Sequence, residues 1–206
     1  PESFILPVWG NVSGLAQMSL IRHRDKLEKE MGSLSDSAGK QLINYADSCL
    51  EGVELAPYAA AYGRSAKDFF WGCNSDKASN QGIAFLYAYR LTNDRRYLTN
   101  ALHSMDYLLG RNATGYCYVT GFGHKSPLHP HHRLAASDGI DEPLPGFLVG
   151  GPNPGKQDGC EYPSLVPDEA YVDILPSYAS NEIAINWQGM FTYYVMALDA
   201  TLRDIK

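Results

Sequence analysis

The densest cluster of polar side chains in the sequence is the run His129-Pro130-His131-His132-Arg133. Pro130 biases the residue before it toward extended backbone, and in an extended chain residues two apart point the same way. His131 and Arg133 would then face one side together, where a cation and a hydrogen-bond donor suit a carboxylate or sugar hydroxyls. Three neighbouring histidines also suggest a zinc site, but their spacing fits no helical or finger-like arrangement. We therefore predict a polar binding surface and no metal; His129 could instead only satisfy loop carbonyls.

A second cluster runs from Tyr171 and Asp173 to Glu182, which lies at the expected start of the last helix. Backbone N–H groups at a helix start favour negative charge, so Glu182 could simply complement the helix dipole. The residues alone favour the dipole interpretation.

The elements that position these clusters are helical. Five segments carry apolar residues at helical spacing, the first less regularly than the others. They cover residues 12–31, 35–53, 79–91, 94–109 and 182–200. The link at 92–94 is short enough to make the helices around it an antiparallel pair. No β-type alternation persists, so the predicted fold class is all-α.

Residues 111–181 show no sustained periodicity and are rich in Gly, Pro, His, Asp and Tyr. A connection of this length is either a disordered insert or an ordered, functional one. Its scattered tyrosines and apolar stretches such as 147–149 are too apolar for disorder. We therefore predict an ordered functional surface on a helical scaffold.

Composition excludes several classes of protein. The formal net charge of −6 argues against nucleic acid as a partner, and no run approaches the ~20 apolar residues of a membrane span. The four cysteines have no C-x-x-C spacing, so we expect buried free thiols. Residues 1–4 do not resemble a signal peptide, and we expect the natural beginning of the polypeptide to lie upstream.

Several motifs resemble those of glycoside hydrolase family 9, the cellulases. Residues 118–123 (YVTGFG) with 130–133 (PHHR) resemble the family's first signature, and 171–187, with YxD, Tyr178 and NEIAINW, resembles its second. The stretches 145–153, 70–75 and 106–112 are similar to further landmarks of the family. The resemblance spans about residues 65–200 in the right order.

The resemblance implies a fold and an activity. The fold would be part of an (α/α)6 barrel with long ordered loops forming a cleft, and residues 1–206 would be the C-terminal portion of a single catalytic domain. The activity would be hydrolysis of β-1,4-glucosidic bonds in cellulose or related β-glucans by an inverting acid/base mechanism. The polysaccharide partner is a large polymer, which implies a secreted or periplasmic enzyme.

Position by position, the resemblance makes Glu182 the general acid that protonates the leaving glycosidic oxygen. Asp173 would be a supporting carboxylate, and His131 would complete the catalytic group. Arg133 would join His131 in holding sugar hydroxyls. Two further substrate-binding residues would line the cleft, namely Trp71 and Trp187.

One requirement of the mechanism is missing. Inversion needs a second carboxylate, roughly 6.5–9.5 Å from the acid, to activate a water. The family supplies it from the N-terminal half of the domain, and nothing before residue 65 resembles that half. We therefore expect the N-terminal half of the same domain as a partner. A smaller departure is Gln188, where relatives carry Asn, which affects one hydrogen bond near the acid.

No cofactor is required for this chemistry, although the family allows a structural calcium ion. Asp138, Asp141 and Glu142 would supply oxygen ligands. A rival hypothesis is a non-catalytic carbohydrate-binding module, and a simpler one is a helical interaction domain. A module that only binds needs no acid, so Glu182 together with the His131 and Arg133 pair favours the enzyme.

Overall fold

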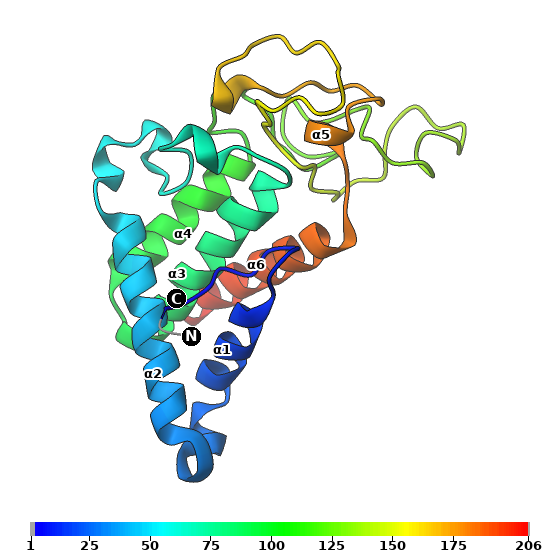
Figure 1. Ribbon diagram of the computed structural model, residues 1–206. Helices are drawn as coiled ribbons and strands as arrows, with labels where there is room; N and C mark the ends of the chain where they lie inside the picture. Colours follow the sequence, from blue (N-terminus) through cyan, green and yellow to red (C-terminus); the bar gives the residue numbers. More distant parts are fainter. Residues whose placement is uncertain (1–2, 206) are drawn as a thin grey trace.

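The computed structural model describes residues 3–205, and Figure 1 shows a body of helices with loops gathered at one end. The α-helices of this part are α1 (Ser13–Arg22), α2 (Arg24–Leu50), α3 (Asn80–Thr92), α4 (Arg95–Leu108), α5 (Tyr178–Asn181) and α6 (Ile185–Asp204). A six-residue π-helical turn, Asn74–Ser79, leads directly into α3. Over residues 3–205, β-structure is limited to isolated bridges. The predicted all-α class is confirmed.

Two helix boundaries differ from the sequence prediction. The segment expected at 12–31 breaks at His23, and α2 then runs through Met31, whose φ of −137° is non-helical. Two expected helices are thus partly merged across a kink. At the other end, α6 begins at Ile185 rather than at residue 182, because residues 182–184 are extended.

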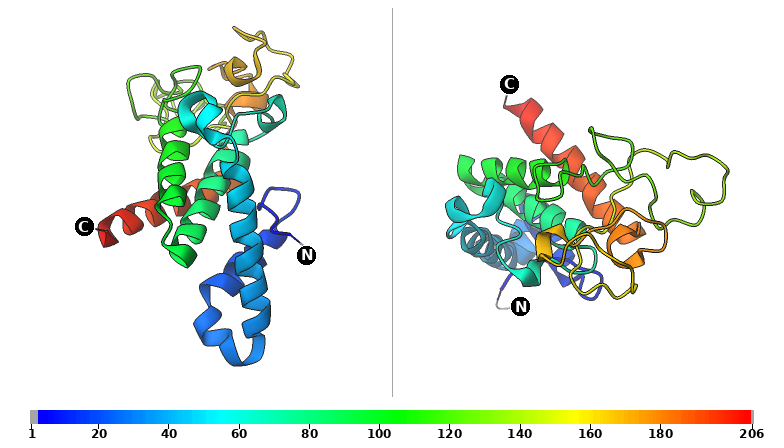
Figure 2. Two further views of the ribbon diagram at one scale, coloured as in Figure 1. Left: turned by 90° about the vertical axis from the view of Figure 1, so that its left-hand side faces the viewer. Right: turned by 90° about the horizontal axis from the view of Figure 1, so that it is seen from above.

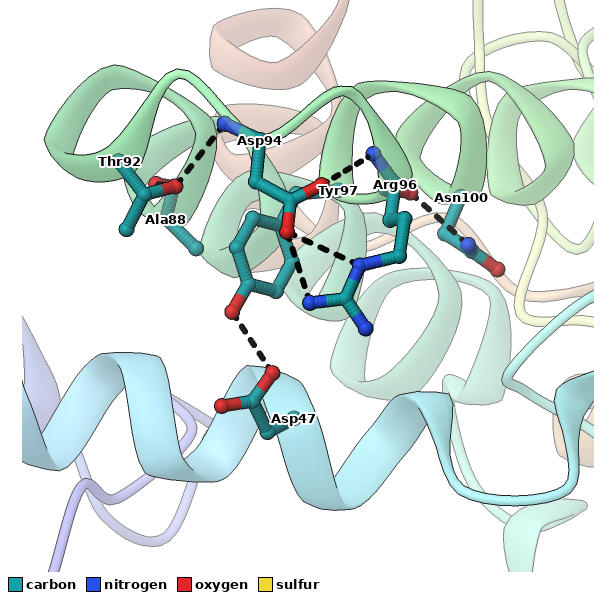
Figure 3. Close-up of polar contacts among 7 residues, drawn as sticks. All are labelled: Asp47, Ala88, Thr92, Asp94, Arg96, Tyr97 and Asn100. Atoms are coloured by element: carbon teal, nitrogen blue, oxygen red, sulfur yellow. Dashed lines mark hydrogen bonds and ion pairs between the residues drawn. The ribbon is translucent and has the colours of Figure 1, made fainter.

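The α3–α4 hairpin has the predicted antiparallel form, and its turn is shown in Figure 3. Asn93 ends α3 in the left-handed conformation, and the Asp94 carboxylate caps α4 by accepting the Arg96 N–H at 2.9 Å. The Tyr97 hydroxyl donates to Asp47 of α2 at 2.7 Å. This contact fastens the hairpin to the long helix beside it.

The core lies where α6 crosses the hairpin. Tyr194 of α6 is fully buried, its hydroxyl donates to the Ala101 carbonyl of α4, and its ring lies directly against Gly82 of α3. A Cβ at Gly82 would overlap that ring, so glycine is what allows the two helices to approach. Ile83 and Leu108 are fully buried in the same cluster.

The long connection between α4 and α5 is packed, as predicted. Figure 2 shows from two further sides that it gathers at one end of the helices. Tyr118 and Leu148 are fully buried, and an isolated bridge joins Val119 to Leu148. Tyr118 contacts Tyr171 edge-on, with ring centroids 5.2 Å apart. Tyr118 also contacts the ring of Tyr107 in α4, with centroids 6.4 Å apart, and this contact attaches the loops to the helical body.

The four cysteines are free, as predicted, and all except Cys160 are buried. The Cys73 thiol accepts the Tyr62 hydroxyl at 2.9 Å and donates to the Pro152 carbonyl at 3.2 Å. Burial raises the pKa of Cys73 to about 12, so the thiol stays protonated and links the helices to the loops.

Candidate active site

Glu182 lies in an extended segment between α5 and α6, and the chain on either side of it is held by two loops. On one side, the His131 N–H donates to the Asn181 carbonyl at 2.8 Å, which forms a parallel bridge between His131 and Glu182. On the other side, the Gly150 N–H donates to the Glu182 carbonyl at 3.0 Å. The backbone of Glu182 is therefore fixed at the meeting point of three segments.

The prediction that Glu182 begins the last helix is wrong. Its ψ of 155° is extended, and the residue before α6 is Ala184. The carbonyl of Glu182 is used by Gly150 instead of by a helical turn. Within residues 3–205 the Glu182 carboxylate has no hydrogen-bond or ion-pair partner, and the residue is half-buried. The dipole interpretation loses its basis, because a helix terminus acts only within its first turn.

Asp173 is an acceptor for backbone N–H groups. Its Oδ2 accepts from Leu128 at 2.8 Å, and its Oδ1 accepts from His129 at 2.9 Å. Asn181 Nδ2 donates to the same Oδ1 at 3.1 Å. The carboxylate thus anchors the start of the histidine loop, by which we mean residues 128–133. A direct part in catalysis stays a prediction, whereas the anchoring role follows from these contacts.

Within residues 3–205, the ring of His131 is oriented by one hydrogen bond. Its Nδ1 lies 2.7 Å from the Leu175 carbonyl, and because a carbonyl only accepts, the proton belongs on Nδ1. In that tautomer Nε2 carries the lone pair and can accept a hydrogen bond. Its other neighbour is the ring of Tyr178, with centroids 5.9 Å apart. His131 is therefore placed opposite Glu182, and its Nε2 has no hydrogen-bond partner in the described part of the chain.

The assumed extended geometry of the histidine loop ends before Arg133. His131 forms the bridge, but residues 133–137 are a turn, in which the Ala136 N–H donates to the His132 carbonyl. The condition for the two-residue alternation, an extended chain through Arg133, is therefore not met. Arg133 is exposed, and contact with a sugar remains a prediction for it.

The two tryptophans occupy different environments. Trp71 is partly exposed and stacks on Tyr178, with centroids 5.9 Å apart and planes at 14°. Trp187 is only 7% exposed, and its indole packs against Gly72 and Gly150. Little of the Trp187 ring is left to contact a sugar, so its predicted place in a cleft lining does not fit its burial. It supports the loop that binds the Glu182 carbonyl.

Sequence reasoning gave no role to two polar groups that build the site. The first is Asn181, whose side chain is fully buried between Tyr171, Asp173 and the histidine loop. The second is Asp158, which accepts from the Ser177 hydroxyl at 2.7 Å and from the Ala179 N–H at 3.1 Å. Burial raises the pKa of Asp158, but these hydrogen bonds, together with those from the Cys160 N–H and the Tyr162 hydroxyl, outweigh it and lower the pKa below its ordinary value. Neither residue belongs to a periodic pattern, which is why composition and spacing gave no signal.

Gln188 retains a hydrogen bond at the position where the sequence departs from relatives. Its Nε2 donates to the Leu148 carbonyl at 3.2 Å. The longer amide therefore ties α6 to the loop at 148–153 and leaves the acid untouched.

Metal binding is not supported by the described residues. Across residues 3–205, no group of three or more His, Cys, Asp or Glu side chains is placed to hold a metal ion. The proposed calcium ligands Asp138, Asp141 and Glu142 are all exposed, and the Asp138 carboxylate accepts the Ile140 N–H instead. This acidic loop does not fit a calcium ion as it stands.

A cavity of about 700 Å³ lies elsewhere, between α1, α3 and α6. Tyr87, Tyr193 and Met196 are among its lining residues, and none of the site residues is. It is therefore unrelated to the chemistry around Glu182.

The sequence of the chain is similar to those of known proteins. The sequence profile of glycosyl hydrolase family 9 matches residues 2–195. A xyloglucan-specific endo-β-1,4-glucanase of Bacteroides ovatus is 53% identical over 200 residues, which cover 97% of this chain and 34% of that protein. Endoglucanase D of Acetivibrio thermocellus is 34% identical over 187 residues, which cover 90% of this chain and 27% of that protein.

Solved structures agree with the sequence matches. A structure described as Bacteroides ovatus GH9 superposes with a TM-score of 0.89 at 49% identity, over 98% of this chain and 35% of that chain. The family 9 endoglucanase J30 superposes with a TM-score of 0.82 at 31% identity, over 95% of this chain and 36% of that chain. The chain thus spans about a third of the length of these relatives and forms part of their (α/α)6 barrel. On the profile, the identities and the shared fold together, the chain belongs to glycosyl hydrolase family 9.

Proposed function

We propose that this chain carries the acid side of the active site of an inverting β-1,4-glucanase, with Glu182 as the general acid. The observation that supports this most is the state of Glu182. Its backbone is fixed on both sides by His131 and Gly150, while its half-buried carboxyl group has no protein partner within residues 3–205. A rigidly placed acid with a free carboxyl group can meet a glycosidic oxygen without first breaking a protein contact.

In this mechanism, Glu182 gives its proton to the oxygen of the leaving sugar while a water attacks the opposite face of the ring. The base that activates the water would come from a segment outside this chain, in the N-terminal part of the same domain. His131 Nε2 would accept a hydrogen bond from a sugar hydroxyl. The face of Trp71 that Tyr178 does not cover would stack on the sugar.

The outer face of α6 carries exposed apolar side chains, which supports the proposal that a further structural element packs against it. Ile185 is 93% exposed and Met196 is 68% exposed. Large apolar side chains this exposed mark a surface that another element covers. The chain makes up about a third of its relatives, so we assign this face to other helical hairpins of the same barrel. Residues 1–206 would then be the C-terminal portion of one catalytic domain.

The substrate is proposed from the relatives' names. The relative with 53% identity is named for xyloglucan, and the one with 34% identity is named an endoglucanase. We therefore propose a soluble or branched β-1,4-glucan, with xyloglucan first. Such polymers are too large to enter a cell, which supports a secreted or periplasmic enzyme. Among residues 3–205, no helix combines the length and the apolar character of a membrane span.

The proposal is tested by hydrolysis of xyloglucan and of a soluble cellulose derivative by this chain, alone and combined with the remainder of the domain. We expect activity only in the combination, with the α-anomer as the first product seen by proton NMR. Activity of the chain alone would place the base within residues 1–206. Binding of glucan without hydrolysis in the combination would favour the rival carbohydrate-binding module.

A further inference from the structure

Asn181, the residue before Glu182, is fully buried, and both polar atoms of its side chain are bonded. Its Oδ1 accepts the Tyr171 hydroxyl at 2.5 Å, and its Nδ2 donates to the His129 carbonyl at 2.7 Å and to Asp173 Oδ1 at 3.1 Å. Its backbone carbonyl accepts the His131 N–H. One residue therefore binds the histidine loop through both its side chain and its main chain.

Three of these residues form a closed ring of hydrogen bonds, which we call the ring below. The Asn181 amide bonds both the His129 carbonyl and the Asp173 carboxylate, and that carboxylate in turn accepts the His129 N–H at 2.9 Å. Only a primary amide offers two donors and an acceptor at this length. An aspartate here would face a carbonyl and a second carboxylate with lone pairs only, which is unfavourable in a buried place.

The ring controls a distance that matters for the chemistry. Glu182 follows Asn181 directly, and His131 is its bridge partner, so the ring sets how the histidine loop lies against the acid. Trp187 and Gly150 hold the opposite side of Glu182 and are not members of the ring. If the ring opens, the loop shifts on one side of Glu182 only, which misaligns the acid without dissolving the fold.

From this arrangement we propose that Asn181 is a positioning residue, which holds the histidine loop and Glu182 in the register that proton transfer requires. This inference rests on the proposed role of Glu182 as the acid. It goes further because it assigns a function to a residue that touches neither substrate nor the reacting atoms.

The test uses the complete catalytic domain and two substrates. Xyloglucan needs a proton on its leaving oxygen, whereas 2,4-dinitrophenyl β-cellobioside has a leaving group that departs without one. For Asn181→Asp we expect kcat on xyloglucan to fall about 10- to 100-fold, because misplacing a catalytic group by about 1 Å has an effect of that order. On the dinitrophenyl substrate we expect less than about a threefold change, since no acid is needed.

Asn153→Asp is the matched control. Asn153 is also a fully buried asparagine, and its Nδ2 donates to the Ala179 carbonyl at 2.9 Å, but it does not touch the histidine loop. A general loss of stability would affect both substrates alike in this variant. If Asn181→Asp does not fold, Tyr171→Phe takes its place, because it removes only the hydroxyl that holds Asn181 Oδ1. We expect it to give a smaller loss, selective for xyloglucan.

Glu182→Gln separates the two hypotheses. A selective loss on xyloglucan in Glu182→Gln supports the acid, and the same selectivity in Asn181→Asp or Tyr171→Phe supports the positioning role. If Glu182→Gln is selective but the Asn181 and Tyr171 variants lose both activities equally, as the control does, the positioning role is overturned and the acid stands. If Glu182→Gln shows no selectivity, both proposals fail.

Discussion

Gly72→Ala tests how much stability depends on the close packing of Trp187 against Gly72. Gly72 has a φ of +62°, and a Cβ there would overlap the Trp187 indole. An alanine in this conformation costs about 1–2 kcal/mol from backbone strain. Displacing a buried ring from a packed site costs about 1–3 kcal/mol more. We therefore expect the free energy of unfolding to fall by about 2–5 kcal/mol in total.

Gly115→Ala isolates the packing part of that loss. Gly115 has a φ of +66°, close to that of Gly72, and no atom within 4 Å of the position of a Cβ. The difference between the two variants is the cost of moving Trp187. We expect Gly72→Ala to have the lower free energy of unfolding in urea by about 1–3 kcal/mol. Equal losses in the two variants would refute the packing argument, because strain alone would then explain both.

Three further predictions concern stability and reactivity. Burial raises the pKa of Asp76 from 3.8 to about 6, so the folded protein binds this proton more tightly than the unfolded chain and loses stability as the pH rises through that window. After allowance for solvent screening, Asp76→Asn should therefore be more stable than the wild type by about 1–2 kcal/mol at pH 7.5. Below about pH 4 the two proteins should be equally stable, with both stabilities measured by urea unfolding. The same difference in stability at both pH values would contradict this. Tyr97→Phe removes the bond to Asp47 and should lower the free energy of unfolding by about 0.5–1.5 kcal/mol in calorimetry, and no change would mean that the hairpin is held by packing alone. In a thiol-labelling experiment at pH 8, Cys160 should react first, because it is the half-exposed thiol, and Cys73 should react only on unfolding; early modification of Cys73, located by mass spectrometry, would contradict its burial.

The helices were predictable because their apolar spacing and their packing agree. The α3–α4 pair follows from a short link that allows no other arrangement, and Asn93 and Asp94 supply the turn and the cap. The start of α6 was not predictable, because residues 182–184 carry helical spacing but are held extended. The Gly150 N–H donates a hydrogen bond to the Glu182 carbonyl, and this contact joins residues more than thirty positions apart in the sequence.

The candidate site, like the helices, was predictable only in part. Resemblance located the histidine loop and Glu182, and the structure brings His131 and Glu182 together. Local alternation failed for Arg133, because a turn begins there. The burial of Trp187 could not be seen either, because it depends on the glycines at 72 and 150 that pack on its ring. For Glu182 and Trp187 the sequence did not reveal the distant partner that fixes the residue, whereas for Arg133 it did not reveal a local turn.

The most direct test of the central claim is kcat/KM of the complete catalytic domain on a soluble β-1,4-glucan, compared between wild type and Glu182→Gln. Glutamine keeps the size of the side chain but has no proton to give. If Glu182 is the acid, the rate constant should fall about 10²- to 10⁴-fold with folding unchanged by circular dichroism. A value within about threefold of the wild type would contradict the assignment, because general acid catalysis by this residue could not then contribute to the reaction.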